Sequence, residues 1–343
     1  MTALLPGRIR VHSRWTGGDR WNAVRCRLGR FRMGYAVAPG LYILDAAGPG
    51  SPVIVSGNYR LTFDMVRRDL AGVPCWILIL DTGGIDVWSA SAAGTFSTDA
   101  VVAAVKRSRL SEVVRHRDLI IPRLGAAGID AAVVLQHCGF AVRVGPVRSK
   151  DLPMYLGSGE TSPSMSEVRF SITDRLALTP WEVGRSLKAW AVFVLGAFLY
   201  SGATPSGVLV DRAWPGTWTL AALGLGAVFA GSFLAPAILP WVPLRSVALK
   251  GWAVGAAVCA AILFGAGLAS GMDPLQAAAS LVFFPAASAF MTRAFGAALP
   301  LHDPAAAQAA RREKRLFVPL FAAACVVSAG LFVLSKLRQW GLL

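Results

Sequence analysis

Five long stretches without a charged residue, all in the second half of the chain, constrain the fold most. They lie between Lys188 and Asp211, Arg212 and Arg245, Lys250 and Asp273, Asp273 and Arg293, and Arg315 and Lys336. A membrane-spanning helix needs about 20 apolar residues, and each stretch is long enough. We therefore predict five transmembrane helices in a chain whose mean hydropathy is +0.54.

The composition changes near residue 185, because charged residues mix with short apolar runs before this point. This predicts a soluble domain followed by a membrane domain. The boundaries that we expect are a basic N-terminal arm at 1–40, an α/β domain at 41–157, a linker with a membrane-surface helix at 158–186, and a transmembrane domain at 187–343. Thr179 and Pro180 suit the N-cap and first position of that surface helix.

Loop charges predict the orientation of these helices. Loops on the side of the first domain carry Arg185, Lys188, Arg245, Lys250, Arg293, Arg311, Arg312, Lys314 and Arg315, whereas the other side carries Arg212, Lys336 and Arg338. Basic loops stay in the cytoplasm, so we expect a multi-pass protein of the cytoplasmic membrane, with its N-terminal domain in the cytoplasm and its C-terminus outside. The first apolar run is too short for a signal peptide.

The formal net charge of +15 is divided almost evenly between the two parts. A cytoplasmic membrane face with anionic lipid accounts for this charge, so membrane lipid rather than nucleic acid is the expected partner. The arginine-rich segment 1–32, with Trp15 and Trp21, is predicted to lie against lipid headgroups or to form a solvated arm.

Apolar runs at 52–55, 76–80, 119–121 and 141–144 alternate with helical segments such as 63–70 and 99–106. This alternation predicts a Rossmann-like α/β domain with a parallel sheet covered on both faces. In such a sheet, ligands bind beyond the carboxyl ends of the strands. No G-x-G-x-x-G motif and no phosphate-binding loop is present, which disfavours a nucleotide cofactor.

The spacing of the cysteines and histidines does not indicate a zinc or iron–sulfur site. The cysteines have no C-x-x-C pair, and the histidines never fall at i, i+4; they are Cys26, Cys75, Cys138, Cys259, Cys325, His12, His116, His137 and His302. Buried reduced thiols and scattered histidines are the simpler interpretation.

The window 85–96 closes a predicted strand and opens a short helix. Small residues at 89–94 lie between Trp88 and Phe96. They favour either a close-packed turn or the close approach of a flat ligand, and composition leaves both open.

Four segments together resemble one known family: 58–64 (NYRLTFD), 76–82 (WILILDT), 85–96 (IDVWSASAAGTF) and 145–148 (GPVR). They are similar to HgcA, the membrane-bound corrinoid protein of mercury methylation, and to the related corrinoid iron–sulfur protein of acetyl-CoA synthesis. In HgcA the window forms a cap helix whose cysteine ligates cobalt. The resemblance implies a corrinoid-binding domain followed by five membrane helices.

Several positions of the cap motif are altered. Asp86 replaces asparagine, Ser89 the cobalt-ligating cysteine, Ala92 a glycine and Ala93 a lysine. The resemblance implies that a cobalamin-type corrinoid contacts Asn58, Thr82, Asp86, Val87, Trp88, Ser89, Ala90, Ser91, Ala92, Ala93, Gly94, Thr95, Phe96, Leu124, Gly125, Gly145, Pro146 and Val147. Ser89 is a weak candidate for the cobalt ligand, because a hydroxyl stays protonated at neutral pH.

We therefore expect a membrane-anchored, corrinoid-dependent protein of methyl transfer, in which the serine argues against mercury methylation. The resemblance implies two partners, a ferredoxin-like [4Fe-4S] reductant and a methyl-pterin donor enzyme. The alternative is a non-catalytic paralogue that acts as a corrinoid-binding sensor or a membrane assembly protein.

Overall fold

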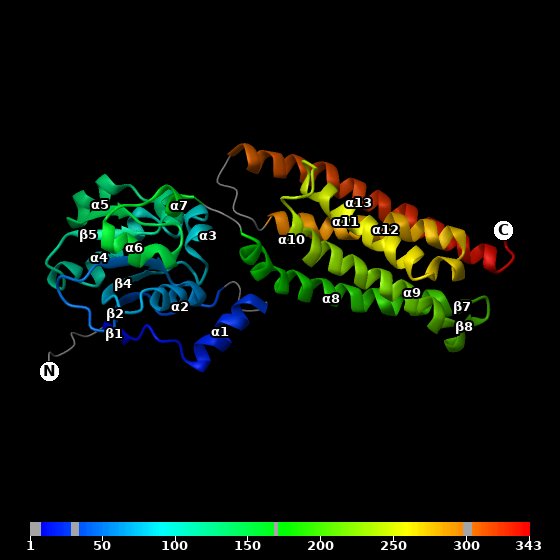
Figure 1. The fold of residues 1–343 in the computed structure, drawn as a ribbon, viewed down its shortest axis with the longest axis horizontal. Coiled ribbons are helices and arrows are strands. Elements are labelled where there is room, and N and C mark those ends of the chain that lie inside the picture. Colours follow the sequence, from blue (N-terminus) through cyan, green and yellow to red (C-terminus); the bar gives the residue numbers. More distant parts are fainter. Residues whose placement is uncertain (1–7, 29–33, 168–170, 298–303) are drawn as a thin grey trace. The chain divides into compact units, whose positions relative to one another are not determined.

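The computed structural model describes residues 8–28, 34–167, 171–297 and 304–343 (Figure 1). The chain forms two compact units, Met1–Arg169 and Phe170–Leu343. The first unit is α/β and the second is almost entirely helical.

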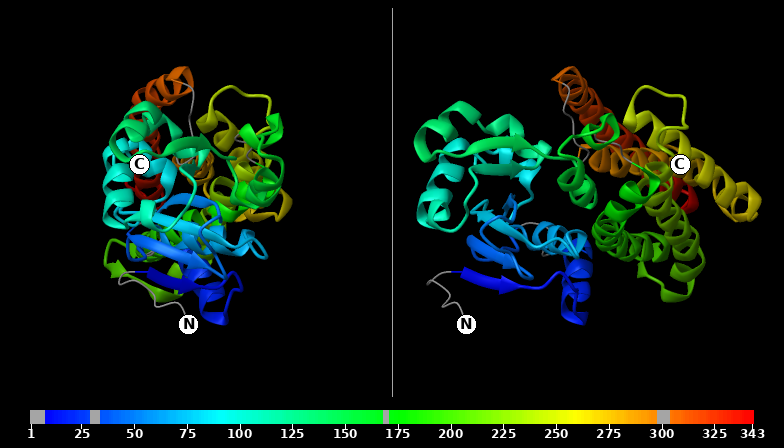
Figure 2. Two further views of the ribbon diagram at one scale, coloured as in Figure 1. Left: turned by 90° about the vertical axis from the view of Figure 1, so that its left-hand side faces the viewer. Right: turned by 60° about the vertical axis from the view of Figure 1, so that its left-hand side comes forward.

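A six-stranded sheet with the order β1-β2-β4-β3-β5-β6 forms the centre of the first unit (Figure 1, Figure 2). The strands are β1 (Arg8–Val11), β2 (Gly40–Leu44), β3 (Val53–Gly57), β4 (Cys75–Leu80), β5 (Asp118–Ile121) and β6 (Ala141–Val144). The last four are parallel to one another, as predicted. However, β2 runs antiparallel to β4 and parallel to β1, so the sheet is mixed.

Helices cover both faces of this sheet. They are α1 (Gly17–Leu28), α2 (Arg60–Asp69), α3 (Val87–Ala92), α4 (Thr98–Arg107), α5 (Ala131–Cys138), α6 (Leu152–Ser158) and α7 (Pro163–Ser166). Single 3-10 turns occupy Leu110–Glu112, Arg123–Gly128 and Ser149–Asp151.

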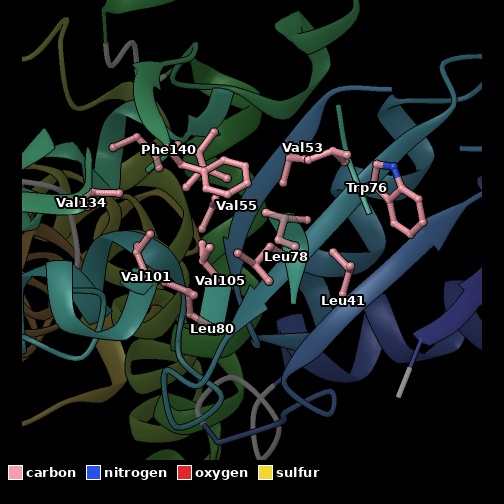
Figure 3. Close-up of a cluster of buried hydrophobic side chains, with 14 of the residues drawn as sticks. Leu41, Val53, Val55, Trp76, Leu78, Leu80, Val101, Val105, Val134 and Phe140 are labelled. Atoms are coloured by element: carbon pink, nitrogen blue, oxygen red, sulfur yellow. The ribbon is translucent and has the colours of Figure 1, made fainter. Parts of the chain in front are cut away.

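Two apolar clusters show why the central strands are continuously apolar. Alternate residues of β4, such as Leu78, pack with α4 and α5 in the cluster of Figure 3, which includes Val105 and Phe140. The intervening residues, such as Ile77, pack on the opposite face with α2 and α6. A strand buried on both faces loses the alternation of polar and apolar residues, and every residue of β3 and β4 is buried.

The described part of the expected basic arm, residues 8–28, is folded into this unit as β1 and α1. Asp19 of α1 forms ion pairs with Arg60 (2.9 Å) and Arg67 (2.6 Å) of α2. Burial alone would raise the pKa of Asp19, but hydrogen bonds from Thr16 and the charge of Arg67 outweigh it and lower the pKa to about 2. The expectation of a separate arm is therefore wrong for these residues.

The second unit contains α8 (Ile172–Gly202), α9 (Val210–Phe229), α10 (Ala235–Ile238), α11 (Val247–Ala260), α12 (Pro274–Ala297) and α13 (Pro304–Gln339). A short hairpin of β7 (Ala203–Thr204) and β8 (Gly207–Val208) follows α8, and π-helical turns at Ala230–Leu234 and Ala261–Gly265 extend α9 and α11. Five helical segments are long and apolar enough to cross a membrane. The five apolar helices that the sequence predicts are thus present, and membrane crossing stays a prediction.

The first of these helices begins earlier than expected, because a capping box, not Thr179, starts α8. Ser171 accepts a hydrogen bond from the backbone N–H of Asp174, whose carboxylate accepts one from the backbone N–H of Ser171 in return. Pro180 therefore lies inside the helix, where it cannot donate to the carbonyl of Leu176. The Thr179 hydroxyl donates to this carbonyl instead, at 2.8 Å. No separate surface helix starts at Thr179.

Candidate functional site

The turns that follow β3 and β4 are joined by a buried hydrogen-bond network. Asn58 Oδ1 accepts from the backbone N–H groups of Thr82 (3.0 Å) and Gly84 (2.9 Å). The Thr82 hydroxyl lies 2.9 Å from Asn58 Oδ1 and 2.8 Å from the carbonyl oxygen of Ile85. Because Asn58 and Thr82 are both buried, this network fixes the path of the chain from β4 into the cap helix.

Asp81 also belongs to this network, although the sequence pattern does not assign it a role. Its carboxylate accepts hydrogen bonds from Asn58 Nδ2 at 3.0 Å and from the backbone N–H of Gly83 at 3.1 Å. An aspartate directly after a buried strand and before Gly83-Gly84 is the signal that indicates such a turn.

Asp86 is the N-cap of the cap helix α3. Its Oδ1 accepts from the backbone N–H groups of Trp88 and Ser89, each at 3.1 Å. Its Oδ2 accepts from the hydroxyl of Ser89 at 2.8 Å. Two of the four altered positions of the motif are therefore in direct contact, and the aspartate stabilises the first turn of the helix.

The cap helix packs closely on the 3-10 turn after β5. A Cβ added to Gly125 would lie 2.5 Å from Phe96 Cε1 and 2.8 Å from Val87 Cγ1. Gly128, which the sequence pattern did not single out, would place a Cβ 2.5 Å from the carbonyl oxygen of Phe96 and 3.1 Å from Ser91 Oγ. Both positions favour glycine, because a Cβ would meet the side chains of Phe96 and Val87 at Gly125 and the backbone of Phe96 at Gly128.

Burial divides the remaining cap residues into two groups. Val87, Ala90 and Phe96 are buried, while Trp88, Ser89 and Ser91 are half-buried. The exposed residues follow one another at the end of the helix and are Ala92, Ala93, Gly94 and Thr95. A Cβ added to Gly94 would meet nothing within 4 Å, so these small residues border open space.

The carbonyl of Ala90 holds the end of the cap in place. It accepts hydrogen bonds from the backbone N–H groups of Thr95 (2.9 Å) and Phe96 (3.1 Å). The Thr95 hydroxyl lies 3.3 Å from the same oxygen. Thr95 therefore contacts local backbone, which is the alternative role for such a residue.

The turn after β6 is joined to the turn after β5. The backbone N–H of Gly145 donates to the carbonyl of Ile121 at 2.8 Å, and the carbonyl of Pro146 accepts from Arg123 at 3.5 Å. Gly145 and Pro146 are buried, whereas Val147 and the neighbouring Leu124 are half-buried. The backbone N–H of Val147 donates to Met165 of α7, and none of these hydrogen bonds involves a residue of the cap helix.

The site offers no strong metal ligand in the part of the chain that the structure describes. There, no three side chains of histidine, cysteine, aspartate or glutamate come together as a metal site would require. The Ser89 hydroxyl keeps its proton and donates a hydrogen bond to Asp86, so the position of the motif cysteine holds only a neutral oxygen.

The model of the CO dehydrogenase/acetyl-CoA synthase delta subunit family matches residues 31–156. The chain is also similar to subunits gamma of the acetyl-CoA decarbonylase/synthase complex. That of Methanopyrus kandleri is 37% identical over 35% of this chain and 26% of its own length. The subunit of Archaeoglobus fulgidus is 36% identical, over 33% of this chain and 24% of its own length.

The match is thus confined to one domain, and the chain spans about a quarter of the length of these curated relatives. The narrower likeness to HgcA remains a prediction. What the comparisons establish is that residues 31–156 are similar to a domain of the CO dehydrogenase/acetyl-CoA synthase delta subunit family.

Proposed function

We propose that this chain is a membrane-anchored corrinoid protein of methyl transfer whose cap helix supplies no ligand to cobalt. The similarity of residues 31–156 to acetyl-CoA synthase subunits supports this proposal, together with the resemblance of the cap window to corrinoid proteins. A bound corrinoid supplies a cobalt centre that accepts a methyl group and passes it on.

The hydrogen bond from Ser89 to Asp86 is the observation that carries the proposal. In the HgcA motif this position holds a cysteine, whose thiolate is a soft, electron-donating ligand. Here the hydroxyl is neutral and already engaged at 2.8 Å by a carboxylate. The chain therefore supports transfer of a methyl cation equivalent, as in acetyl-CoA synthesis, and not the carbanion chemistry of mercury methylation.

The residues of the cap suit a flat macrocycle. Ala92, Ala93 and Gly94 are exposed and small, and the space beyond Gly94 is open. Small side chains let a rigid ring approach the helix backbone, while Asn58 and Thr82 hold the preceding turn in place. The role of this chain is thus to position the ring.

The other parts of the proposal concern the surroundings of the domain. The five apolar helices anchor it in the cytoplasmic membrane with the α/β unit in the cytoplasm. A ferredoxin-like [4Fe-4S] protein provides electrons, and a methyl-pterin enzyme provides the methyl group. These partners follow from the resemblance alone.

The same hydrogen bond favours a second function. Because the Ser89 hydroxyl is already bound to Asp86 and does not ligate cobalt, the chain also fits a sensor that binds a corrinoid and carries out no reaction. Anaerobic incubation of the purified protein with cobalamin, a reductant strong enough to form Co(I), and a methyl-pterin with its methyltransferase separates the two functions. We expect the bound corrinoid to acquire the methyl group, which is seen as a change in its visible spectrum. Binding without methylation would support the sensor, and failure to bind would contradict both.

A further inference from the structure

Near the hairpin end of the helical unit, a cavity of about 370 Å³ contains two cations that lack a carboxylate partner. Lys336 of α13 and Arg212 of α9 both line it, beside polar residues such as Gln276. Among the described residues, neither cation forms an ion pair. Lys336 is 9% exposed, and an ammonium group buried to this extent normally has a charged partner.

The known contacts of Lys336 leave room for a ligand. Its Nζ donates to the carbonyl of Ser201 at 3.2 Å and lies 4.9 Å from the centre of the Tyr200 ring. Since an ammonium group has three N–H donors, two remain without a hydrogen-bond acceptor in the described part of the unit. An anion in the cavity would accept from these donors and lie close to Arg212.

An apolar cavity of about 240 Å³ adjoins the first, since Tyr200 and Leu220 line both. Its other lining residues are Phe193, Gly196, Ala197 and Phe332. Tyr200, which lines both cavities, is held in place because its hydroxyl donates to the carbonyl of Phe332 at 3.1 Å and accepts from Gln276 Nε2 at 3.0 Å. A cationic cavity that shares two lining residues with an apolar one matches a molecule with an anionic head and a hydrocarbon chain.

We propose that these two cavities form a binding site for one anionic phospholipid, whose phosphate lies against Arg212 and Lys336 and whose acyl chain occupies the apolar cavity. The site requires the helical unit to lie in a membrane, as proposed above. The distribution of charge agrees with a specific role, because two of the three basic residues expected on this side of the membrane line one cavity. Arg212 and Lys336 thus retain a lipid in the outer leaflet of the membrane.

The test is native mass spectrometry of the full chain in nanodiscs that contain equal amounts of phosphatidylglycerol and phosphatidylcholine. Wild-type protein should retain one phosphatidylglycerol. Arg212→Gln and Lys336→Gln should each lower this occupancy about fivefold, the effect of one basic residue near a membrane surface. Arg338→Gln is the matched control, because this arginine is exposed near the same end and does not line either cavity.

The acyl chain is tested separately. A Cβ added to Gly196 or to Gly330 meets nothing within 4 Å, so the backbone tolerates the first carbon of a larger side chain at both positions. Gly196→Leu fills the apolar cavity and should lower occupancy, whereas Gly330→Leu should leave it unchanged. Size-exclusion chromatography and recovery from the membrane fraction show that each variant is folded and embedded, which tests the anchor independently of the lipid.

Three results would overturn the proposal. Equal retention by Arg212→Gln and wild type would show that the cations do not hold the lipid. Equal retention of phosphatidylcholine would remove the charge selectivity. Displacement of phosphatidylglycerol by excess inorganic phosphate, with no effect of Gly196→Leu, would show that the cavity binds a free anion.

Discussion

The contact between Asp86 and Ser89 predicts how the cap would respond if the motif cysteine were restored. Ser89 Oγ lies 2.8 Å from Asp86 Oδ2, so the thiol of Ser89→Cys would face a carboxylate. Two negative charges about 4 Å apart repel by about 1 kcal/mol in water and about 4 kcal/mol at an effective dielectric constant of about 20. At about 1.4 kcal/mol for one pH unit, Asp86 raises the pH at which the thiolate forms by about one to three units.

The double variant Asp86→Asn with Ser89→Cys removes this repulsion and keeps the helix start, since asparagine is as good an N-cap as aspartate. We expect both variants to bind cobalt through sulfur, with the spectral change of the double variant centred about one to three pH units lower. The assay is a pH titration of the visible spectrum after anaerobic reconstitution with a corrinoid.

Two controls make this result specific. Asp86→Asn alone should show no thiolate band, and Ser91→Cys places a thiol on the same helix, toward Gly128. Equal midpoints for the single and double variants would refute the coupling between Asp86 and position 89. A thiolate band in Ser91→Cys would show that the cap is not oriented as described.

Three further predictions concern the fold and its placement. Asp19→Asn should lower the free energy of unfolding by about 2 to 4 kcal/mol, because Arg67 loses a buried partner. Since the native pKa of Asp19 is about 2, the wild-type free energy of unfolding should also fall as the pH drops from about 4 towards 2. Urea titrations of the detergent-purified chain measure both effects. Gly125→Ala should cost about 1 to 3 kcal/mol in the same assay through its contact with Phe96, whereas Gly157→Ala, in an open position, should cost nothing. A reporter enzyme active only outside the cytoplasm should be active when fused to the C-terminus, and an inactive fusion would reverse the predicted topology.

Two of the strands that the sequence predicts correctly, β3 and β4, are buried on both faces. β4 is an unbroken apolar run, and β3 begins with three apolar residues before Ser56, so their pattern is recognisable without knowledge of their neighbours. The strand β1 reads Arg-Ile-Arg-Val at the edge of the sheet, and its pairing with β2 is a long-range contact. No local pattern indicates that contact, which explains why residues 8–28 resemble a free basic arm.

A similar limit applies to the helix that begins the second unit. Thr179 and Pro180 form a valid local start signal, but the helix starts about two turns earlier, at the box formed by Ser171 and Asp174. The Thr179 hydroxyl then satisfies the carbonyl that Pro180 leaves free. Two competing signals of the same kind cannot be ranked from sequence, because the outcome depends on the packing of the whole helix.

The motifs predict which turns lie near the cap, whereas the contacts between them come from the structure alone. The order of the motifs predicts that Asn58 and Thr82 lie at one sheet edge, and the structure joins them by hydrogen bonds. The resemblance places the turn at Gly145 beside the cap helix. In the structure, the hydrogen bonds of this turn join it to Ile121 and Arg123. The link from Ser89 to Asp86 depends on the rotamer of each side chain, which a motif does not specify.

The decisive measurement is the cobalt content and visible spectrum of the wild-type protein, purified in detergent and incubated with cobalamin under reducing, anaerobic conditions. One corrinoid per chain, with a spectrum in which neither the cofactor's own base nor a thiolate ligates cobalt, is the expected result. Protein that retains no cobalt after removal of free cobalamin would contradict corrinoid binding by this chain.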